Sequence, residues 1–144
     1  MKEIIKRENI VVGLPAEPHE SAIRRCGKML VDAGYVKPRY VEGMIARDRG
    51  FSTAIGNYIA IPHGEKEYKN DILKTGLSIL TYPDGVDWGG QKVYLVIGIA
   101  AQGEEHLGIL ENIVDKLEDG DDVLALVNAG DVDAILATLA GEGS

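Results

Sequence analysis

The sequence is poor in cysteine and has no long hydrophobic run. Its 144 residues include a single cysteine, which excludes an internal disulfide and a cysteine-rich zinc cluster. That residue, Cys26, lies among apolar residues at helical spacing, so we expect it to be buried as a small hydrophobic side chain. The longest apolar run, residues 93–101, is far too short to span a bilayer, and residues 1–8 lack the apolar stretch of a signal peptide. We therefore expect a cytoplasmic protein that is not inserted into a membrane.

Positive charge is also scarce. Fifteen Lys and Arg residues face 23 Asp and Glu residues, for a net charge of -8. A surface of this charge repels phosphate backbones on average, so nucleic acid is not an expected partner. Hydrophobic residues make up 45% and charged residues 26% of the chain, as in globular proteins. The length fits one domain, which we expect to cover residues 1–144.

Hydrophobic periodicity predicts strands interspersed with helices. Short apolar or β-branched runs predict strands at residues 10–12, 59–61, 74–81 and 93–100. Apolar residues at helical spacing predict helices at residues 18–33, 38–47, 104–117, 121–127 and 131–139. Residues 50–56 are expected to form a loop, and residues 83–85, Pro-Asp-Gly, a turn. This order indicates an α/β fold with helices around a mixed sheet, in which the almost wholly apolar run 93–100 is a central strand.

The chain lacks most of the motifs that mark enzymes. A serine nucleophile elbow, the HExxH zinc motif, the P-loop and the dinucleotide-binding glycine pattern are all absent from the sequence. The candidates for chemistry are therefore the three histidines, His19, His63 and His106. His19 lies at a predicted helix start between acidic residues, and we assign it no role.

His63 lies in the segment Ile-Pro-His-Gly at residues 61–64, at the end of a predicted strand. Pro62 restricts the approach of the backbone, and Gly64 lets a partner or a phosphate come close to it. A neutral imidazole is a nucleophile near pH 7 and needs no base to activate it. The alternative is a turn histidine whose ring is satisfied by a carbonyl group, because short motifs of this kind have many false matches.

His106 follows the strand predicted at residues 93–100 and falls in the first turn of the next predicted helix. A helix N-terminus favours a nearby anion, to which a histidine can donate a hydrogen bond; the alternative is a solvated residue at a helix start. If the strands before His63 and His106 are parallel neighbours, both side chains reach one cleft. Arg47 and Arg49 lie near the end of another predicted helix, where they either complement the helix dipole or clamp phosphate oxygens.

These residues resemble a known family, the enzyme IIA component of the bacterial phosphoenolpyruvate-dependent sugar phosphotransferase system, in its mannitol/fructose class. The likeness runs from about residue 8 to residue 140, and its specific part is Ile-Pro-His-Gly combined with the downstream Gly-Ile-Ala-Ala and Glu-His. The segment Tyr-Pro-Asp-Gly-Val favours the mannitol type. The matching segments are residues 56–64, 73–76, 82–86, 96–101 and 105–107.

The resemblance implies roles for three residues. His63 matches the histidine that carries the phosphoryl group, His106 the second active-site histidine, and Arg47 the arginine of the family's Met-x-x-Arg segment. It also implies a mixed five-stranded sheet with helices on both faces and a phosphotransferase activity, for which no metal or organic cofactor is required. In one departure, the family's usual Thr-Tyr-Leu-Gly is Thr-Ala-Ile-Gly at residues 53–56 here, which could change the loop packing beside His63.

The expected function is that of a phosphoryl carrier. The protein would accept a phosphoryl group from the histidine phosphocarrier protein on His63 and pass it to a sugar-specific IIB domain of the membrane permease, in support of mannitol uptake. An acidic rim, with Glu104 and Glu105 as candidates, would surround the site. Two alternatives stay open: a regulatory relative of the nitrogen type, and a metal-binding domain that uses His63, His106 and a carboxylate such as Glu105.

Overall fold

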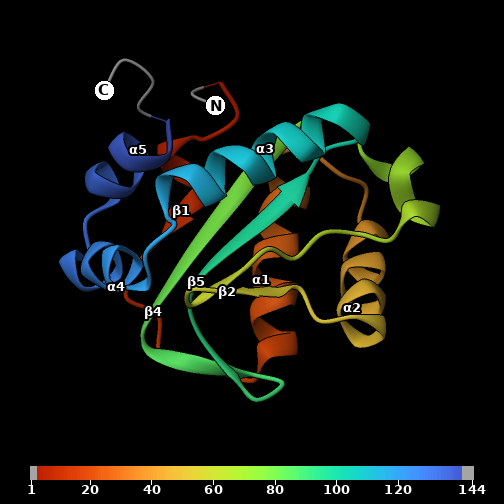
Figure 1. The fold of residues 1–144 in the computed structure, drawn as a ribbon. Coiled ribbons are helices and arrows are strands. Elements are labelled where there is room, and N and C mark those ends of the chain that lie inside the picture. Colours follow the sequence, from red (N-terminus) through yellow and green to blue (C-terminus); the bar gives the residue numbers. More distant parts are fainter. Residues whose placement is uncertain (1–2, 141–144) are drawn as a thin grey trace.

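One mixed sheet of five strands, in the order β1-β4-β5-β3-β2, forms the centre of the computed structural model, which describes residues 3–140 (Figure 1). Strand β1 is parallel to β4 and β3 is parallel to β5, whereas β4 pairs with β5 and β2 with β3 in antiparallel register. The chain is a single α/β domain, as the sequence predicts. The strands are β1 (Ile10–Val11), β2 (Ala54–Gly56), β3 (Ile59–Ala60), β4 (Gly76–Trp88) and β5 (Gln91–Ala100).

Helices cover both faces of this sheet. Helices α1 (His19–Asp32) and α2 (Tyr40–Gly50) lie on one side, and α3 (Gly103–Lys116), α4 (Gly120–Ala129) and α5 (Val132–Ala140) lie on the other (Figure 1). Two short 3-10 helices, η1 (Arg7–Asn9) and η2 (Lys66–Asp71), were not predicted. None of the helices within residues 3–140 combines the length and the hydrophobicity needed to cross a bilayer.

Strand β5 is central, as its apolar sequence predicts. Its side chains alternate between two cores, because successive residues of a strand point to opposite faces. Leu95 and Ile97 pack with α3, α4 and α5, while Val96 and Ala100 pack with α1 and α2; all four are fully buried. Cys26 of α1 is buried in the second core as a free thiol, which confirms that prediction.

The turn predicted at residues 83–85 is wrong. Strand β4 continues through these residues to Trp88. Its pairing with β5 is irregular here: residues 82–85 of β4 lie opposite Tyr94 alone, between the regular pairs on either side. This irregular stretch tolerates Pro83, which has no N–H for the ladder, and the positive φ of 79° at Gly85. The chain reverses instead at Gly89 and Gly90, both with positive φ, as two-residue hairpin turns require.

The loop predicted at residues 50–56 is also partly wrong. Gly50 is the last residue of α2, and residues 54–56 form the edge strand β2, which pairs with β3. The hairpin turn between them consists of Asn57 and Tyr58, with φ of 52° and 68°. Two consecutive left-handed residues other than glycine are not expected from sequence, so the turn and its short strand were missed.

Candidate active site

The parallel pairing of β3 with β5 brings His63 and His106 together. Ile59 and Ala60 of β3 lie beside Leu95 and Val96 of β5. His63 follows the end of β3, while His106 lies in the first turn of α3, just after β5. Their ring centroids are 4.7 Å apart, at an interplanar angle of 56°. The prediction that the two histidines share one cleft is therefore confirmed.

A backbone carbonyl sets the tautomer of His63. Its Nδ1 lies 2.7 Å from the carbonyl oxygen of Ile61. Because a carbonyl oxygen only accepts, Nδ1 carries the proton and donates it. The lone pair of the neutral ring is then on Nε2, which makes Nε2 the nucleophilic atom of this side chain. The hydrogen bond to a carbonyl that we posed as an alternative to function is present, and it prepares the ring for nucleophilic chemistry.

The cleft keeps His63 neutral. Burial lowers its pKa from 6.5 to about 4; the hydrogen bond to Ile61 opposes this shift, and the charges of His106 and Arg47 add to it. Burial followed by the charge of Arg47 also lowers the pKa of His106. Both imidazoles are therefore uncharged near pH 7, and His63 is a nucleophile over a wider pH range than an ordinary histidine.

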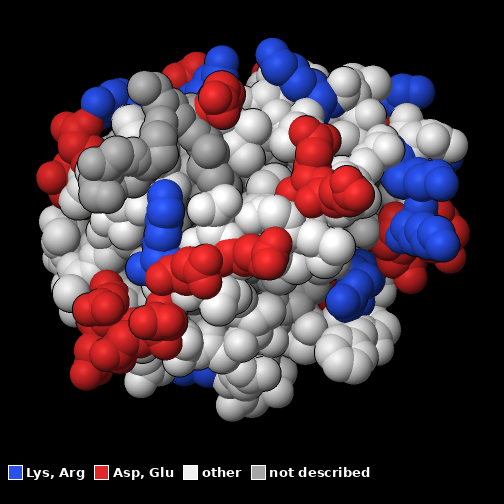
Figure 2. All heavy atoms as spheres, turned by 45° about the horizontal axis from the view of Figure 1, so that its top comes forward, with Lys and Arg blue, Asp and Glu red and all other residues white. Residues whose placement is uncertain are grey.

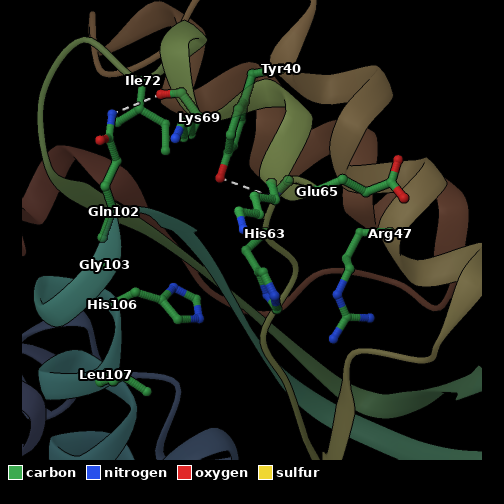
Figure 3. A pocket seen from close by; sticks show the side chains of 13 residues that line it. Tyr40, Arg47, His63, Glu65, Lys69, Ile72, Gln102, Gly103, His106 and Leu107 are labelled. Atoms are coloured by element: carbon green, nitrogen blue, oxygen red, sulfur yellow. Dashed lines mark hydrogen bonds between the residues drawn. The ribbon is translucent and has the colours of Figure 1, made fainter.

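Arg47 and Arg49, which the helix pattern alone could not rank, have different surroundings. Arg47 lines the cleft, and His63 lies between it and His106 (Figure 3). Arg49 instead pairs with Glu20 of α1, at 2.6 Å between Nε and Oε2. Arg47 is thus the arginine that lines the cleft with the two histidines, and its positive charge lowers the pKa of both.

Tyr40 of α2 holds the loop that carries His63. Its hydroxyl accepts a hydrogen bond from the N–H of Gly64 and donates one to the carbonyl of Ile99 in β5, both at 2.9 Å. A side chain on Gly64 would also collide with the ring of Tyr40, at 2.6 Å from its Cβ. The sequence places Tyr40 only within the helix predicted at residues 38–47, because nothing local indicates a contact with residues 24 and 59 positions away.

The cleft is lined from three sides, by α2, by η2 with the loop before it, and by the start of α3. It encloses about 770 Å³. Its edge carries Glu65, Lys66 and Lys69 beside the histidines, and Gln102 joins η2 to α3 by donating to the carbonyl of Lys69. The rim is therefore mixed in charge, and the expected acidic rim is wrong for the η2 side.

A metal site is poorly supported by this geometry. The carboxylate proposed as a third ligand, Glu105, accepts a hydrogen bond from Thr75 at 2.7 Å. Within residues 3–140, no group of three His, Cys, Asp or Glu side chains is placed to hold a metal ion. Arg47 would also repel a cation placed between His63 and His106. The same charge favours an anion.

Comparison with known proteins assigns the family. The sequence profile described as "Phosphoenolpyruvate-dependent sugar phosphotransferase system, EIIA 2" matches residues 3–141. The chain belongs to this family. It is a phosphotransferase component of the IIA type, as the sequence motifs predict.

Named relatives agree with this assignment. A mannitol-specific phosphotransferase enzyme IIA component from Halalkalibacterium halodurans is 43% identical over 136 residues, which are 94% of each chain. A mannitol-specific EIICBA component from Vibrio cholerae is 41% identical over 139 residues, which are 94% of this IIA chain but 21% of that protein. Similar IIA sequences thus occur both alone and within longer chains.

A solved structure also matches this IIA domain closely. It is the complex of enzyme IIAMTL with phosphorylated enzyme IIBMTL from Escherichia coli, which matches with a TM-score of 0.89 and 39% sequence identity. The match covers 96% of this chain and 98% of that one.

Proposed function

We propose that this IIA domain carries a phosphoryl group on Nε2 of His63, taking it from the histidine phosphocarrier protein and passing it to a mannitol-specific IIB domain. The observation that carries this proposal is the neutral His63 with Nδ1 bound to a carbonyl, beside His106 and Arg47. The mannitol relatives support the sugar, and the Escherichia coli complex with phosphorylated IIB supports the acceptor. The whole chain, residues 1–144, would form this one domain, and it would work in the cytoplasm.

The transfer is a nucleophilic displacement at phosphorus. The lone pair of His63 Nε2 forms the new N–P bond while the bond from phosphorus to the donor's imidazole breaks, and its electron pair stays on the donor nitrogen. Catalysis of such transfers is almost entirely positioning and electrostatic stabilisation. His63 Nδ1 keeps its proton and its bond to the Ile61 carbonyl throughout, so the ring does not need to turn between accepting and releasing the group.

Two side chains would balance the charge of the moving group. A phosphoryl group brings about two negative charges at neutral pH. Arg47 has a fixed positive charge, and its planar fork can hold two oxygens at once. His106 is neutral, so it can donate one N–H to a phosphoryl oxygen without repelling Arg47.

The surface beside the cleft carries a strong acidic strip. Figure 2 shows negative side chains gathered over α3 and near the start of α4, with positive ones over η2 at the right edge. Such a strip favours a partner face that is basic, and complementary charge of this kind mainly speeds association. The exposed acidic residues of the strip are Glu104, Glu105, Glu111, Asp115, Glu118, Asp119, Asp121 and Asp122.

A chase experiment tests the proposed relay. The protein is labelled with ³²P from the phosphorylated phosphocarrier, separated from it, and mixed with purified IIB domains of mannitol and fructose systems. The label should move rapidly to the mannitol IIB and much more slowly to the fructose one. Label that moves to neither IIB would contradict a transport role and favour the regulatory alternative of the nitrogen type.

The acceptor should stay active in mildly acidic solution. Because the pKa of His63 is lowered to about 4, its ring should titrate near pH 4 rather than near 6.5, as followed by NMR of the ring protons. Between these two values the unfolded chain binds a proton that the folded chain does not, so stability should fall as the pH is lowered through this range. A midpoint near 6.5 would show that the cleft does not keep His63 neutral.

Replacing Arg47 should separate charge from geometry. Arg47→Gln removes charge-assisted hydrogen bonds to the phosphoryl group, and we expect the transfer rate to fall ~10- to 100-fold. Arg47→Lys keeps the charge but loses the planar fork, so it should retain an intermediate rate. Rapid-quench measurement of transfer from the phosphocarrier gives these rates.

Arg49→Gln is the matched control for these variants. Arg49 lies two positions away on the same helix but pairs with Glu20, so its loss should leave the transfer rate unchanged. A slow Arg49→Gln variant with a normal Arg47→Gln variant would show that the wrong arginine was assigned. All three proteins should melt near the wild-type temperature, because neither arginine packs in the hydrophobic cores and the ion pair of Arg49 is exposed.

A further inference from the structure

The guanidinium of Arg47 contacts Phe51, the residue that directly follows helix α2. Nη1 of Arg47 donates a hydrogen bond to the carbonyl of Phe51, and its Cζ lies 5.6 Å from the centre of the Phe51 ring. Within residues 3–140 no carboxylate pairs with Arg47, although Glu65 lines the same cleft. The guanidinium is therefore held by a carbonyl and an aromatic face, and no carboxylate of the described residues neutralises its charge.

The backbone fixes Phe51 at both ends. Its N–H donates to the carbonyl of Arg47 at 3.0 Å, which closes the last turn of α2. Two residues later, Thr53 donates from its N–H and its hydroxyl to the buried carboxylate of Asp48, at 2.9 and 2.6 Å. Trp88 donates to the same carboxylate oxygen at 2.8 Å. These hydrogen bonds on either side fix the backbone position of Phe51, although the residue itself is 75% exposed.

A contact with a carbonyl and an aromatic ring, instead of a carboxylate, suits an arginine that must later bind a phosphoryl group. A carboxylate would compete with the phosphoryl oxygens for the guanidinium, whereas a carbonyl and a ring leave most of its five N–H donors available. A cation–π contact at an exposed site is also weak, so it orients the side chain without trapping it.

We propose that Phe51 is a positioning residue for phosphoryl transfer, whose ring holds the Arg47 guanidinium at the mouth of the cleft until the phosphoryl group arrives. This inference rests on the proposed function of His63 and Arg47. It assigns to residue 51 a role that acts through Arg47, not through direct contact with the partner proteins.

A series of variants tests the aromatic face. Phe51→Ala and Phe51→Leu should both lower the transfer rate about two- to five-fold, and Phe51→Trp should keep it, because Trp gives the strongest cation–π contact. The Phe51 carbonyl is present in all three, and the side chain is exposed, so the melting temperatures should not change. A normal rate in Phe51→Leu with a loss in Phe51→Ala would indicate an apolar docking role and would overturn the proposal.

A double-mutant cycle tests the route through Arg47. In an Arg47→Gln background, Phe51→Leu should have no further effect on the transfer rate. The contact between the Phe51 ring and the guanidinium is already absent there, so Phe51 has nothing left to position. An equal loss in both backgrounds, or no loss in either, would overturn the proposal.

A measurement without partners separates this inference from the proposed function. NMR relaxation of the Arg47 Nε–H group should show a more ordered side chain in the wild type than in Phe51→Leu. Equal mobility in both proteins would overturn the inference even if His63 carries the phosphoryl group. Ordered Arg47 in a protein that takes no label would instead contradict the proposed function alone.

Discussion

Replacing His63 with alanine should abolish phosphoryl acceptance. The reaction needs a nucleophile whose lone pair faces the cleft, and in this site Nε2 of His63 is that atom. The ring centroid of His106 lies 4.7 Å from that of His63, but within residues 3–140 no carbonyl pairs with His106 as that of Ile61 pairs with His63. We therefore expect no ³²P to enter His63→Ala from the phosphocarrier, and no transfer to IIB.

Two further variants make this result specific. His63→Gln keeps a polar side chain of similar size in the half-buried position, so it controls for loss of activity through misfolding. It should also take no label. His19→Ala removes a histidine that lies against Asp48 and Trp88, away from the cleft, and should still take up label. Label that persists on His63→Ala or His63→Gln would show that the acceptor is another residue.

Loss of His106 should slow the transfer without removing the acceptor. If its neutral ring donates a hydrogen bond to the phosphoryl group in the transition state, His106→Ala should reduce the rate by about 10²–10³, or ~3–4 kcal/mol. Labelling should still reach completion on His63 after a longer incubation. Rapid-quench rates for both half-reactions, from the phosphocarrier and to IIB, measure the effect.

A partial rescue separates hydrogen bonding from bulk in this variant. His106→Gln supplies an amide N–H near the same place, so its rate should lie between those of the wild type and His106→Ala. Equal rates for all three proteins would return His106 to the status of a residue that merely lies at a helix start.

The sequence predicted that His63 and His106 share one cleft, because the signals for this are local. Each follows an apolar run that forms a strand, and a parallel pairing of β3 with β5 is enough to bring them together. The resemblance then identified Arg47 over Arg49, which the helix pattern alone left equal. In the structure Arg47 lines the cleft, whereas Arg49 is paired with Glu20 on α1.

The features that were missed depend on contacts between distant segments. Tyr40 joins α2 to the loop of Gly64 and to β5, and no local pattern distinguishes it from a core tyrosine. The 3-10 helix η2, which brings Lys66 and Lys69 to the edge of the cleft, has no apolar periodicity to reveal it. Two features of the sheet were missed: the edge strand β2 with its Asn57-Tyr58 turn, and the reversal at Gly89 and Gly90 instead of at residues 83–85.

The most direct test is to locate the phosphoryl group on the wild-type protein after incubation with the phosphorylated phosphocarrier. Mass spectrometry under alkaline conditions, which preserve a phosphoramidate, identifies the residue, and ³¹P and ¹⁵N NMR identify the nitrogen. We predict a single acid-labile group on Nε2 of His63. A phosphoryl group on Nδ1, on His106 or on any other residue would contradict the account of this site.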